Sequence, residues 1–299
     1  MNARETQKQG RVVQRPGLTI TVAPYAGYCY GVERALRLTD QAVRRCGGPI
    51  TTLGPIIHNP GVVEELASRG VVAVEDASEI REGTVVVRTH GVPPDVVNDL
   101  RQRGLDVVDA TCPFVSVAQR KASMLAAQGY VVVVLGERDH PEVVGLAACA
   151  GGEALVVEDA GELNPDAVVG RRVGVVVQTT QTREQLARLV AALSPLARET
   201  LVYNTVCEAT ERRQAAAREL AGQVDLVVVV GGRNSANTTR LAEICRSIQS
   251  RTIHVEKASE LEGISLAGVR RIGVTAGAST PDGEIEAVVS VLSRAADDR

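Results

Sequence analysis

Three of the six cysteines occur at equivalent places in this 299-residue chain. Cys29, Cys112 and Cys207 follow the segments AGY, DAT and NTV, and each stands directly before a stretch with the apolar spacing of a helix. A helix N-terminus favours the thiolate form of cysteine, which is the form that binds metal. A single cysteine is usually a small buried hydrophobic residue, but a repeated trio before helices indicates metal ligands.

Three thiolates without a fourth ligand fit two kinds of metal site. One is a zinc ion with an open coordination position, and the other is an iron–sulfur cluster that leaves one iron open to a substrate. The spacing of the cysteines leaves both possibilities open. The remaining cysteines have no equivalents in the repeat, and we interpret them as buried structural residues: Cys46, Cys149 and Cys245.

Three of the four histidines fall in loops that join a predicted strand to a predicted helix. His58, His90 and His140 lie in the segments IIHNP, RTHGV and DHPEV, whereas His254 lies in a predicted strand and is interpreted as structural. Each loop histidine alone would be an ordinary solvated side chain. Together they indicate an anionic ligand, because an imidazolium makes charge-assisted hydrogen bonds to phosphate oxygens.

Two further loops offer hydroxyl, amide and backbone N–H groups at helix starts, namely NSANTT at residues 234–239 and AGAST at residues 276–280. A helix N-terminus attracts anions, although each loop alone would be ordinary N-capping. Combined with the histidines, these loops predict a phosphate or diphosphate site. The sequence has no Walker A or GxGxxG motif where a nucleotide would need one, so nucleotide binding is not supported.

Glu142 follows His140 by two residues at the start of a predicted helix. A glutamate in the first turn of a helix is favoured by the helix dipole, and that is its ordinary role. In a pocket with a metal centre, the same carboxyl could donate a proton to a leaving group. The residues alone leave both roles open.

The order of the predicted elements around these residues repeats three times. After each cysteine of the trio come a helix, a strand, a polar loop, a helix, a second strand, a second polar loop and a third helix. The separations along the chain are similar: 29 residues from Cys29 to His58, 28 from Cys112 to His140, and 27 from Cys207 to Asn234. Valine-rich runs at residues 130–136 and 225–232 are typical of parallel strands buried on both faces.

These patterns predict an α/β fold of three similar small modules, each a parallel sheet covered by helices and built with right-handed crossovers. Ligands in such sheets bind beyond the carboxyl ends of the strands, where all six polar loops are expected. If a pseudo-three-fold axis relates the modules, the cysteines and loops converge on one centre. The predicted boundaries are a flexible tail at 1–17 and modules at 18–111, 112–206 and 207–299.

Composition narrows the possible partners and location. The net charge is −3 and aromatic residues make up 2% of the chain, which argues against nucleic acid as a main partner. No apolar run reaches the length of a transmembrane helix, and the N-terminus lacks the apolar core of a signal peptide. We therefore expect no membrane partner and a cytoplasmic location.

Taken together, the motifs resemble the 4-hydroxy-3-methylbut-2-enyl diphosphate reductase family, also named LytB, which catalyses the last step of the methylerythritol phosphate route to isoprenoids. The resemblance runs in order from about residue 19 to residue 290. It rests on these segments: AGYCYGVERAL, GPIIHNP, RTHGVPP, DATCP, HPEVVG, QTT, VCEATERRQ, RNSANTTRL and GVTAGASTPD. Any one segment is a weak signal, whereas the whole series in register is highly specific.

The resemblance implies a trefoil of three α/β modules around a central 4Fe–4S cluster, which three cysteines hold with one iron left open. The implied cluster ligands are Cys29, Cys112 and Cys207. The implied diphosphate site comprises His58, His90, His140, Ser235, Asn237 and Ser279. Glu142 matches the proton-relay acid, Thr179 a hydroxyl that orients the substrate, and Thr210 a threonine near the cluster.

The implied reaction is the reductive dehydroxylation of (E)-4-hydroxy-3-methylbut-2-enyl diphosphate, an allylic diphosphate. Two electrons and two protons remove the allylic hydroxyl as water, which leaves isopentenyl and dimethylallyl diphosphate. The resemblance also implies ferredoxin or flavodoxin as the electron donor.

Two positions depart from the pattern of the family. Ala236 stands where many members have a second serine, and Asp139 stands where glycine is common. The first change removes a hydroxyl from a phosphate loop, and the second adds a carboxylate near an anionic site. The two departures keep open a divergent relative that uses the same cluster on another allylic or aryl diphosphate, or in another dehydroxylation. The spacing of the cysteines separately keeps open a non-enzymatic phosphate-binding or sensor module with zinc on the three cysteines.

Overall fold

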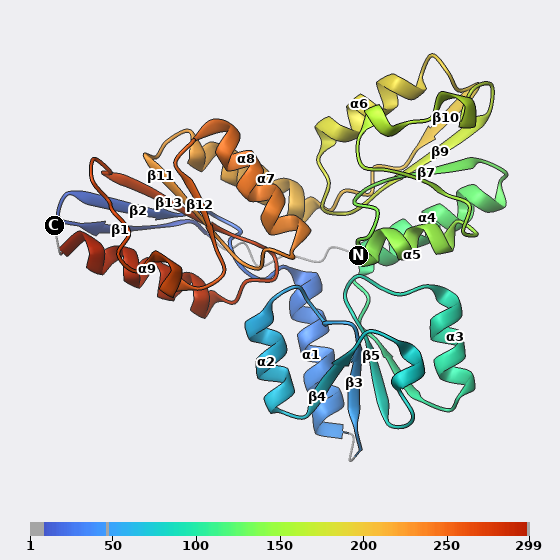
Figure 1. Ribbon diagram of the computed structural model, residues 1–299, viewed down its shortest axis with the longest axis horizontal. Coiled ribbons are helices and arrows are strands. Elements are labelled where there is room, and N and C mark those ends of the chain that lie inside the picture. The colour runs from blue at the N-terminus through green and yellow to red at the C-terminus, as the bar shows by residue number, and fades with distance from the viewer. Residues whose placement is uncertain (1–8, 46–47, 298–299) are drawn as a thin grey trace. The chain divides into compact units, whose positions relative to one another are not determined.

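The computed structural model describes residues 9–45 and 48–297, whose helices and strands are drawn in Figure 1. Cys46 and the first eight residues of the predicted tail lie outside the described residues. The chain forms two compact units. The first unit combines the residues up to Glu33, residues 58–61 and the residues from Glu208 onward, and the second combines residues 34–57 and 62–207.

The second unit contains two four-stranded sheets that are parallel throughout. The strand order of one is β4 (Val71–Val74), β3 (Ile50–Leu53), β5 (Thr84–Val87) and β6 (Asp106–Asp109). The order of the other is β8 (Leu155–Val157), β7 (Val131–Leu135), β9 (Arg172–Val177) and β10 (Glu199–Val202). The small parallel sheets predicted from the sequence are therefore confirmed.

The first unit contains the third sheet, in which β1 is the only antiparallel strand among the described residues. Its strand order is β1 (Arg11–Arg15), β2 (Leu18–Val22), β13 (Arg271–Ala276), β11 (Leu226–Val230) and β12 (Thr252–Val255). Pro16 and Gly17 form the two-residue turn between β1 and β2, and Gly17 has φ +68°, which favours glycine. The prediction of a flexible tail is therefore wrong for residues 11–15.

The three sheets share one arrangement of four parallel strands, to which the third sheet adds β1, and this arrangement corrects a predicted module boundary. In each sheet the strand before a cysteine pairs in parallel with a central strand: β6 with β5 before Cys112, β10 with β9 before Cys207, and β2 with β13 before Cys29. Each cysteine of the trio thus closes a sheet and does not open one. The strand Leu18–Val22 belongs to the third sheet and not to the first module, because it pairs in parallel with β13.

A helix begins directly after each cysteine of the trio, as the sequence predicts. The helices are α1 (Tyr30–Arg45), α2 (Pro60–Ser68), α3 (Pro94–Gln102), α4 (Pro113–Ala127), α5 (Pro141–Cys149), α6 (Arg183–Leu193), α7 (Glu208–Ala221), α8 (Ala236–Ile248) and α9 (Asp282–Asp297). Short 3-10 helices lie at η1 (Ala77–Glu79), η2 (Ala160–Glu162), η3 (Pro165–Ala167) and η4 (Ala258–Leu261).

Two of these helices pack on their sheets in the same way. A Cβ atom on Gly174 of β9 would lie 2.6 Å from Leu125 of α4, and one on Gly273 of β13 would lie 2.7 Å from Leu220 of α7. In both sheets a strand glycine lets the helix after a cysteine approach closely. This close packing fixes the position of each helix on its sheet. It therefore also fixes the position of the cysteine that directly precedes the helix.

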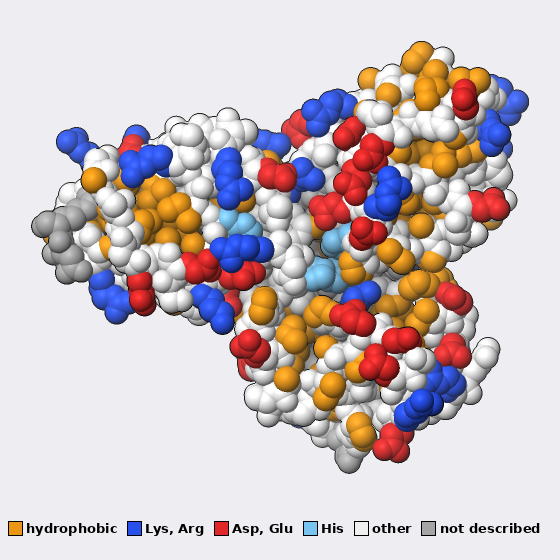
Figure 2. Space-filling model, in the orientation of Figure 1, with side chains coloured by type: hydrophobic (Ala, Val, Ile, Leu, Met, Phe, Trp, Pro, Cys, Tyr) orange, Lys and Arg blue, Asp and Glu red, His pale blue; other side chains and the backbone are white. Residues whose placement is uncertain are grey.

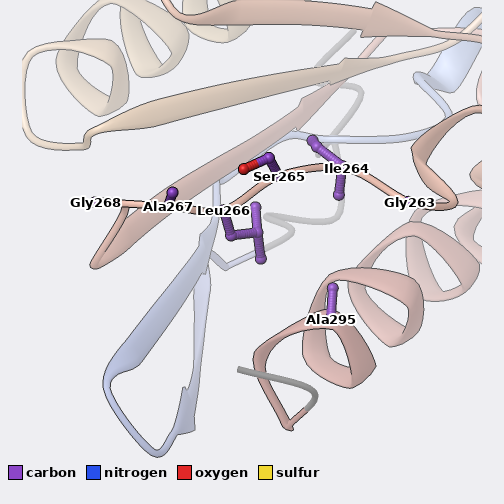
Figure 3. A pocket seen from close by; sticks show the side chains of 7 residues that line it. All are labelled: Gly263, Ile264, Ser265, Leu266, Ala267, Gly268 and Ala295. Carbon is purple, nitrogen blue, oxygen red and sulfur yellow. The ribbon is translucent and has the colours of Figure 1, made fainter.

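The surface agrees with the balanced composition. Basic and acidic side chains are interspersed on the face shown in Figure 2. Within residues 9–45 and 48–297, no helix has the length and apolarity needed to cross a membrane. A pocket of about 460 Å³ is lined by Gly263–Gly268 and Ala295 (Figure 3). It lies at the amino end of β13, so it is at the wrong edge of the sheet for a site formed by the loops after the strands.

Candidate functional site

The predicted loop residues lie beyond the carboxyl ends of parallel strands, where α/β sheets bind ligands. His58 follows β3, His90 follows β5 and His140 follows β7. Thr179 follows β9, Ser235 follows β11 and Ser279 follows β13. The second unit holds His90, His140, Glu142 and Thr179, and the first holds His58, Thr210, Ser235, Asn237 and Ser279. Convergence of all of them on one centre stays a prediction.

Glu142 is a buried carboxyl held by Thr179. It lies in the first turn of α5 with 1% of its surface exposed. The backbone N–H of Thr179 donates to Oε1 at 2.6 Å, and the hydroxyl of Thr179 donates to Oε2 at 2.9 Å. Burial raises the pKa of Glu142 to about 7, although the two hydrogen bonds from Thr179 act in the opposite direction. A carboxyl of this kind can both hold and release a proton near neutral pH.

His140 is oriented by the same helix start. It caps α5, and its Nδ1 accepts a hydrogen bond of 3.1 Å from the backbone N–H of Glu142. The ring proton of neutral His140 therefore sits on Nε2. The ring of His90 meets that of His140 edge to face, with 5.2 Å between centroids and an interplanar angle of 88°. Two predicted phosphate ligands and the predicted acid thus lie together in the second unit.

Gln178 is a residue of this site that the sequence analysis missed. It is fully buried just after β9, and its Oε1 accepts a 2.9 Å hydrogen bond from the backbone N–H of Glu137 after β7. A Cβ on Gly136 would lie 2.6 Å from Val143 and 2.7 Å from Gln178, so the loop needs glycine there. These contacts lock the loop of Thr179 to the loop that leads to Glu142. The signal that could have identified it is a glutamine directly after a valine-rich strand, at the start of the segment QTT.

The raised pKa of Glu142 predicts that the wild-type protein loses stability as the pH rises. Its usual pKa is 4.5 and its pKa in the fold is about 7, so the folded state binds this proton more tightly than the unfolded state. The free energy of unfolding should therefore fall across that pH interval. In Glu142→Gln this contribution is absent, so the wild type should lose about 3 kcal/mol relative to the variant. Urea denaturation of both proteins at the two ends of the interval measures this, and a pH-independent difference would contradict it.

The first unit presents an incompletely satisfied polar group at the start of α8. Ser235 caps this helix, and its hydroxyl accepts a 3.4 Å hydrogen bond from the backbone N–H of Thr238. Asn237 is 5% exposed, and neither its Oδ1 nor its Nδ2 has a hydrogen-bond partner among the described residues. Buried amides are nearly always hydrogen-bonded, so Asn237 indicates a polar ligand at this helix N-terminus. Ala236 is buried beside it and supplies no hydroxyl.

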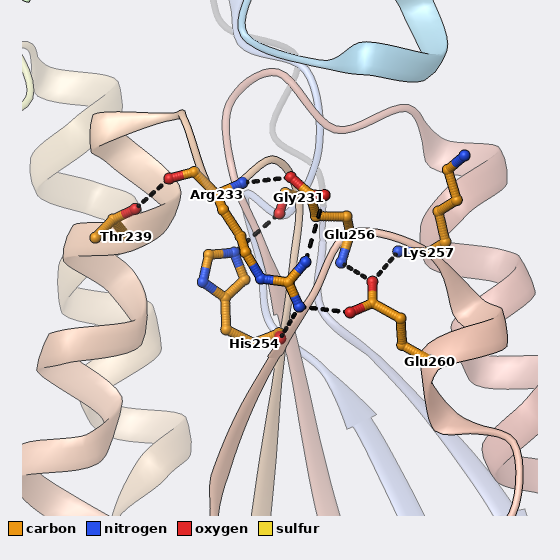
Figure 4. A network of polar contacts seen from close by, with 7 residues as sticks. All are labelled: Gly231, Arg233, Thr239, His254, Glu256, Lys257 and Glu260. Atoms are coloured by element: carbon orange, nitrogen blue, oxygen red, sulfur yellow. Dashed lines mark hydrogen bonds and ion pairs between the residues drawn. The ribbon is translucent and has the colours of Figure 1, made fainter.

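A network of side chains holds the loop between β11 and α8 (Figure 4). The backbone N–H of Arg233 donates to Glu256 at 2.7 Å, and the backbone carbonyl of Arg233 accepts from the hydroxyl of Thr239 at 3.1 Å. His254 lies in β12, as predicted, and its Nε2 is 2.9 Å from the carbonyl oxygen of Gly231. Since a carbonyl only accepts, His254 is the donor and carries its proton on Nε2. These bonds preorganise the start of α8.

His58 is anchored to the loop after β13. The hydroxyl of Ser279 donates to the backbone carbonyl of His58 at 3.1 Å. Next to it, the amide of Asn59 lies 3.2 and 3.3 Å from the two carboxylate oxygens of Glu284. Asn59 is 3% exposed, and burial raises the pKa of Glu284. The proton of Ser279 is thus engaged by His58, so an anion that bound Ser279 would have to compete for it.

Replacing Ser235 by alanine is expected to affect both stability and anion binding. Loss of the N-cap should lower the free energy of unfolding by about 1 kcal/mol. It should also weaken the binding of inorganic diphosphate about tenfold, because one hydroxyl is removed from the start of α8. The control is Asp76→Ala, which removes the N-cap of η1. Denaturation and calorimetry measure the two effects, and a stability loss with unchanged diphosphate binding would exclude Ser235 from the anion site.

The three predicted cluster ligands have one backbone environment in common. Each is half-buried, and each donates its backbone N–H to the carbonyl of the second residue after a central strand. The pairs are Cys112 with Thr89 after β5 at 2.9 Å, Cys207 with Thr179 after β9 at 3.0 Å, and Cys29 with Ala278 after β13 at 3.2 Å. The trio is therefore tied to the strand-end loops that carry the other predicted site residues. Thr210 is buried in the first turn of α7, three residues after Cys207.

The other described cysteines lie within helices. Cys149 ends α5 and Cys245 is buried in α8. Burial raises the pKa of both thiols, and that of Cys245 to about 11, so both are protonated near neutral pH. The prediction of a buried residue is confirmed for Cys245, whereas Cys149 is half-buried.

Comparison with known proteins gives a consistent result over most of the chain. The family model described as LytB protein matches residues 20–293. Two relatives are named 4-hydroxy-3-methylbut-2-enyl diphosphate reductase. The one from Aquifex aeolicus is 43% identical over 276 residues, covering 91% of this chain and 94% of its own. The one from Geobacter sulfurreducens is 46% identical over 275 residues, covering 91% of this chain and 96% of its own.

Two solved structures are also similar. One, described as (E)-4-hydroxy-3-methyl-but-2-enyl diphosphate reductase, the terminal enzyme of the non-mevalonate pathway, is 41% identical with a TM-score of 0.69. The match covers 92% of this chain and 99% of that one. The other is the E-1-hydroxy-2-methyl-but-2-enyl-4-diphosphate reductase from Plasmodium falciparum, which is 27% identical with a TM-score of 0.82. The match covers 89% of this chain and 85% of that one.

Proposed function

Because this chain belongs to the LytB protein family, we propose that it removes the allylic hydroxyl of (E)-4-hydroxy-3-methylbut-2-enyl diphosphate. The substrate takes up two electrons and two protons, its C–O bond breaks, and the hydroxyl leaves as water. The products are isopentenyl and dimethylallyl diphosphate. The observation that carries the proposal is the buried Glu142 carboxyl, whose pKa of about 7 allows it to be protonated at neutral pH beside Thr179.

The chain's own residues have two roles, anion binding and proton donation. Asn237, Ser235 and the N-terminus of α8 bind the diphosphate, and the three loop histidines supply further donors. Ser279 adds a donor when its hydroxyl turns from the carbonyl of His58 to the anion. Glu142 gives one of the two protons to the departing hydroxyl. The N–H and hydroxyl of Thr179 then stabilise the carboxylate that remains.

The cofactor we propose is a 4Fe–4S cluster held by Cys29, Cys112 and Cys207, in a family of iron–sulfur enzymes. The donor set fits such a group, because the three thiols are half-buried at helix starts, whereas Cys149 and Cys245 lie within helices with raised pKa values. When bound, the cluster would supply electrons and an open, Lewis-acidic iron. Ferredoxin or flavodoxin would be the electron donor.

The test is an assay of anaerobically purified protein for iron, sulfide and turnover with a chemical reductant. We expect about four iron and four sulfide per chain for a 4Fe–4S cluster, and water-forming reduction of the allylic diphosphate. Zinc in place of iron and sulfide would favour a phosphate sensor. Faster turnover of another allylic or aryl diphosphate would favour a divergent relative, for which Ala236 is the motivating residue. Asp139 is exposed, so its charge is solvated and less able to alter the site.

A further inference from the structure

Arg213 is a buried cation that the proposed mechanism does not use. It lies in α7 with 2% of its surface exposed. Its Nε donates to the carbonyl of Tyr25 at 2.9 Å, and one terminal nitrogen donates to the carbonyl of Gly27 at 3.0 Å. The other terminal nitrogen lies 3.3 Å from the carbonyl of Ala209 in its own helix. A planar guanidinium has the donor geometry to hold two neighbouring carbonyls at once.

The segment that Arg213 holds is conformationally unfavourable. Tyr25 has φ +64° and is the one non-glycine residue with positive φ in the described part of the chain. Gly27 has φ +98°. A left-handed conformation is costly for tyrosine and persists only where surrounding contacts enforce it. Such strain beside Cys29, a proposed cluster ligand, indicates a function for the contact.

Cations also contact the segments before the other two cysteines of the trio, although the two contacts differ in kind. Arg34 of α1, the helix after Cys29, donates to the carbonyl of Thr111 at 3.1 Å, directly before Cys112. Lys121 of α4, the helix after Cys112, places its Nζ 4.3 Å from the ring centroid of Tyr203, shortly before Cys207. Thus a cation from the helix after one cysteine holds the segment before another. Arg34 resembles Arg213 in donating to a backbone carbonyl, whereas Lys121 contacts a side-chain ring.

We propose that Arg213 is a positioning residue that fixes the Tyr25–Gly27 segment and, through it, Cys29. It acts by enforcing the left-handed turn, and it touches neither substrate nor reacting atoms. The proposal rests on the proposed role of Cys29 as a cluster ligand. It predicts that Arg213 is needed because residue 25 is a tyrosine. A glycine at this position would adopt the same turn without the cation.

The test compares Arg213→Met and Arg213→Lys with the wild-type holoenzyme. Hydrogen exchange of the amides from Tyr25 to Cys29 should accelerate about tenfold or more in Arg213→Met, because charge-assisted hydrogen bonds are lost. The iron should also be removed by a chelator about tenfold faster. Arg213→Lys keeps the positive charge but not the paired N–H donors of the guanidinium. Its rates of amide exchange and iron release should therefore lie between those of the wild type and Arg213→Met.

The second part of the test removes the backbone strain at Tyr25 by replacing this residue with glycine. In the Arg213→Met background, Tyr25→Gly should restore much of the slow iron release, whereas Tyr25→Gly alone should leave iron release near the wild-type rate. Arg271→Met is the control, since it breaks the ion pair with Asp225 at the opposite end of β13. It should change neither the exchange of this segment nor the release of iron.

The outcomes separate this proposal from the proposed function. Unchanged exchange in Arg213→Met would overturn the positioning role, as would the absence of any rescue by Tyr25→Gly. If Arg213→Met does not fold, unchanged exchange in Arg213→Lys decides against the proposal in the same way. If the wild type binds no iron, the proposed function fails, and exchange alone then decides the role of Arg213.

Discussion

Glu142→Gln is expected to lower turnover by a factor of about 10² to 10⁴, the usual contribution of a positioned general acid. Glutamine preserves the size of the side chain. Its one oxygen can still accept from the backbone N–H of Thr179, and its NH2 group can donate to the hydroxyl oxygen of Thr179, which reverses the second hydrogen bond. The pocket should therefore keep its shape and its affinity for inorganic diphosphate. What is lost is the proton on a carboxyl whose pKa is about 7. Steady-state kinetics and diphosphate calorimetry on the same preparation measure both quantities.

The pH profile distinguishes proton donation from a purely structural role. The rate of the wild-type enzyme should fall as the pH rises above about 7, because Glu142 then loses its proton. The hydroxyl of Thr179 lowers the pKa of Glu142, so Thr179→Val should raise that pKa and move the alkaline limb to higher pH. If Glu142 had a purely structural role, Thr179→Val would lower the rate without changing the pH above which the rate falls.

The control for the glutamate series is Glu199→Gln. Glu199 lies in β10 and pairs with Arg172 at 2.9 Å, at the ends of the strands opposite the site. Replacing Glu199 should change the free energy of unfolding. It should change neither the turnover rate nor the pH above which that rate falls. Turnover of Glu142→Gln within a few-fold of wild type would remove Glu142 from the mechanism and return it to its ordinary role as a first-turn residue.

The sequence was most informative where residue type and local order suffice. Valine-rich runs identified β7 and β11, because strands buried on both faces show little alternation. The cysteine trio was identified by its repeated position before helices. The pairing of Leu18–Val22 was not predicted, because strand partners are set by tertiary contacts. Its parallel partner, β13, lies more than 200 residues further along the chain.

The residues that were missed act through the backbone. Arg213 lies in a helix, where an arginine is ordinarily solvated, and its role depends on the carbonyls of Tyr25 and Gly27, which are remote in the sequence. Gln178 likewise binds the backbone of another loop. The loop of Asn237 was identified because its position at a helix start is local, and the family resemblance then singled out Asn237. The structure adds that its amide is buried without a partner among the described residues. Local chemistry was predictable, and contacts between distant loops were not.

Cys112→Ser should remove most of the iron from the anaerobically purified protein, whereas Cys149→Ser should leave it in place. The two thiols are well matched, since both are half-buried and both lie in the second unit, at the start of α4 and the end of α5. Serine differs from cysteine by one atom, and its hydroxyl is a poor ligand for iron. The difference between the variants therefore reports ligation and not packing.

The same substitution at Cys29 and Cys207 tests the number of ligands. A cluster held by three cysteines predicts similar iron loss in all three serine variants, with circular dichroism that shows an intact fold. Retention of iron in any one of them would contradict the proposed ligand set, and it would point to a cluster with fewer protein thiolates. Iron loss in Cys245→Ser without unfolding would contradict it as well. Cys245 is fully buried in α8, and its thiol, with a pKa of about 11, lies 3.9 Å from the carbonyl of Ala217.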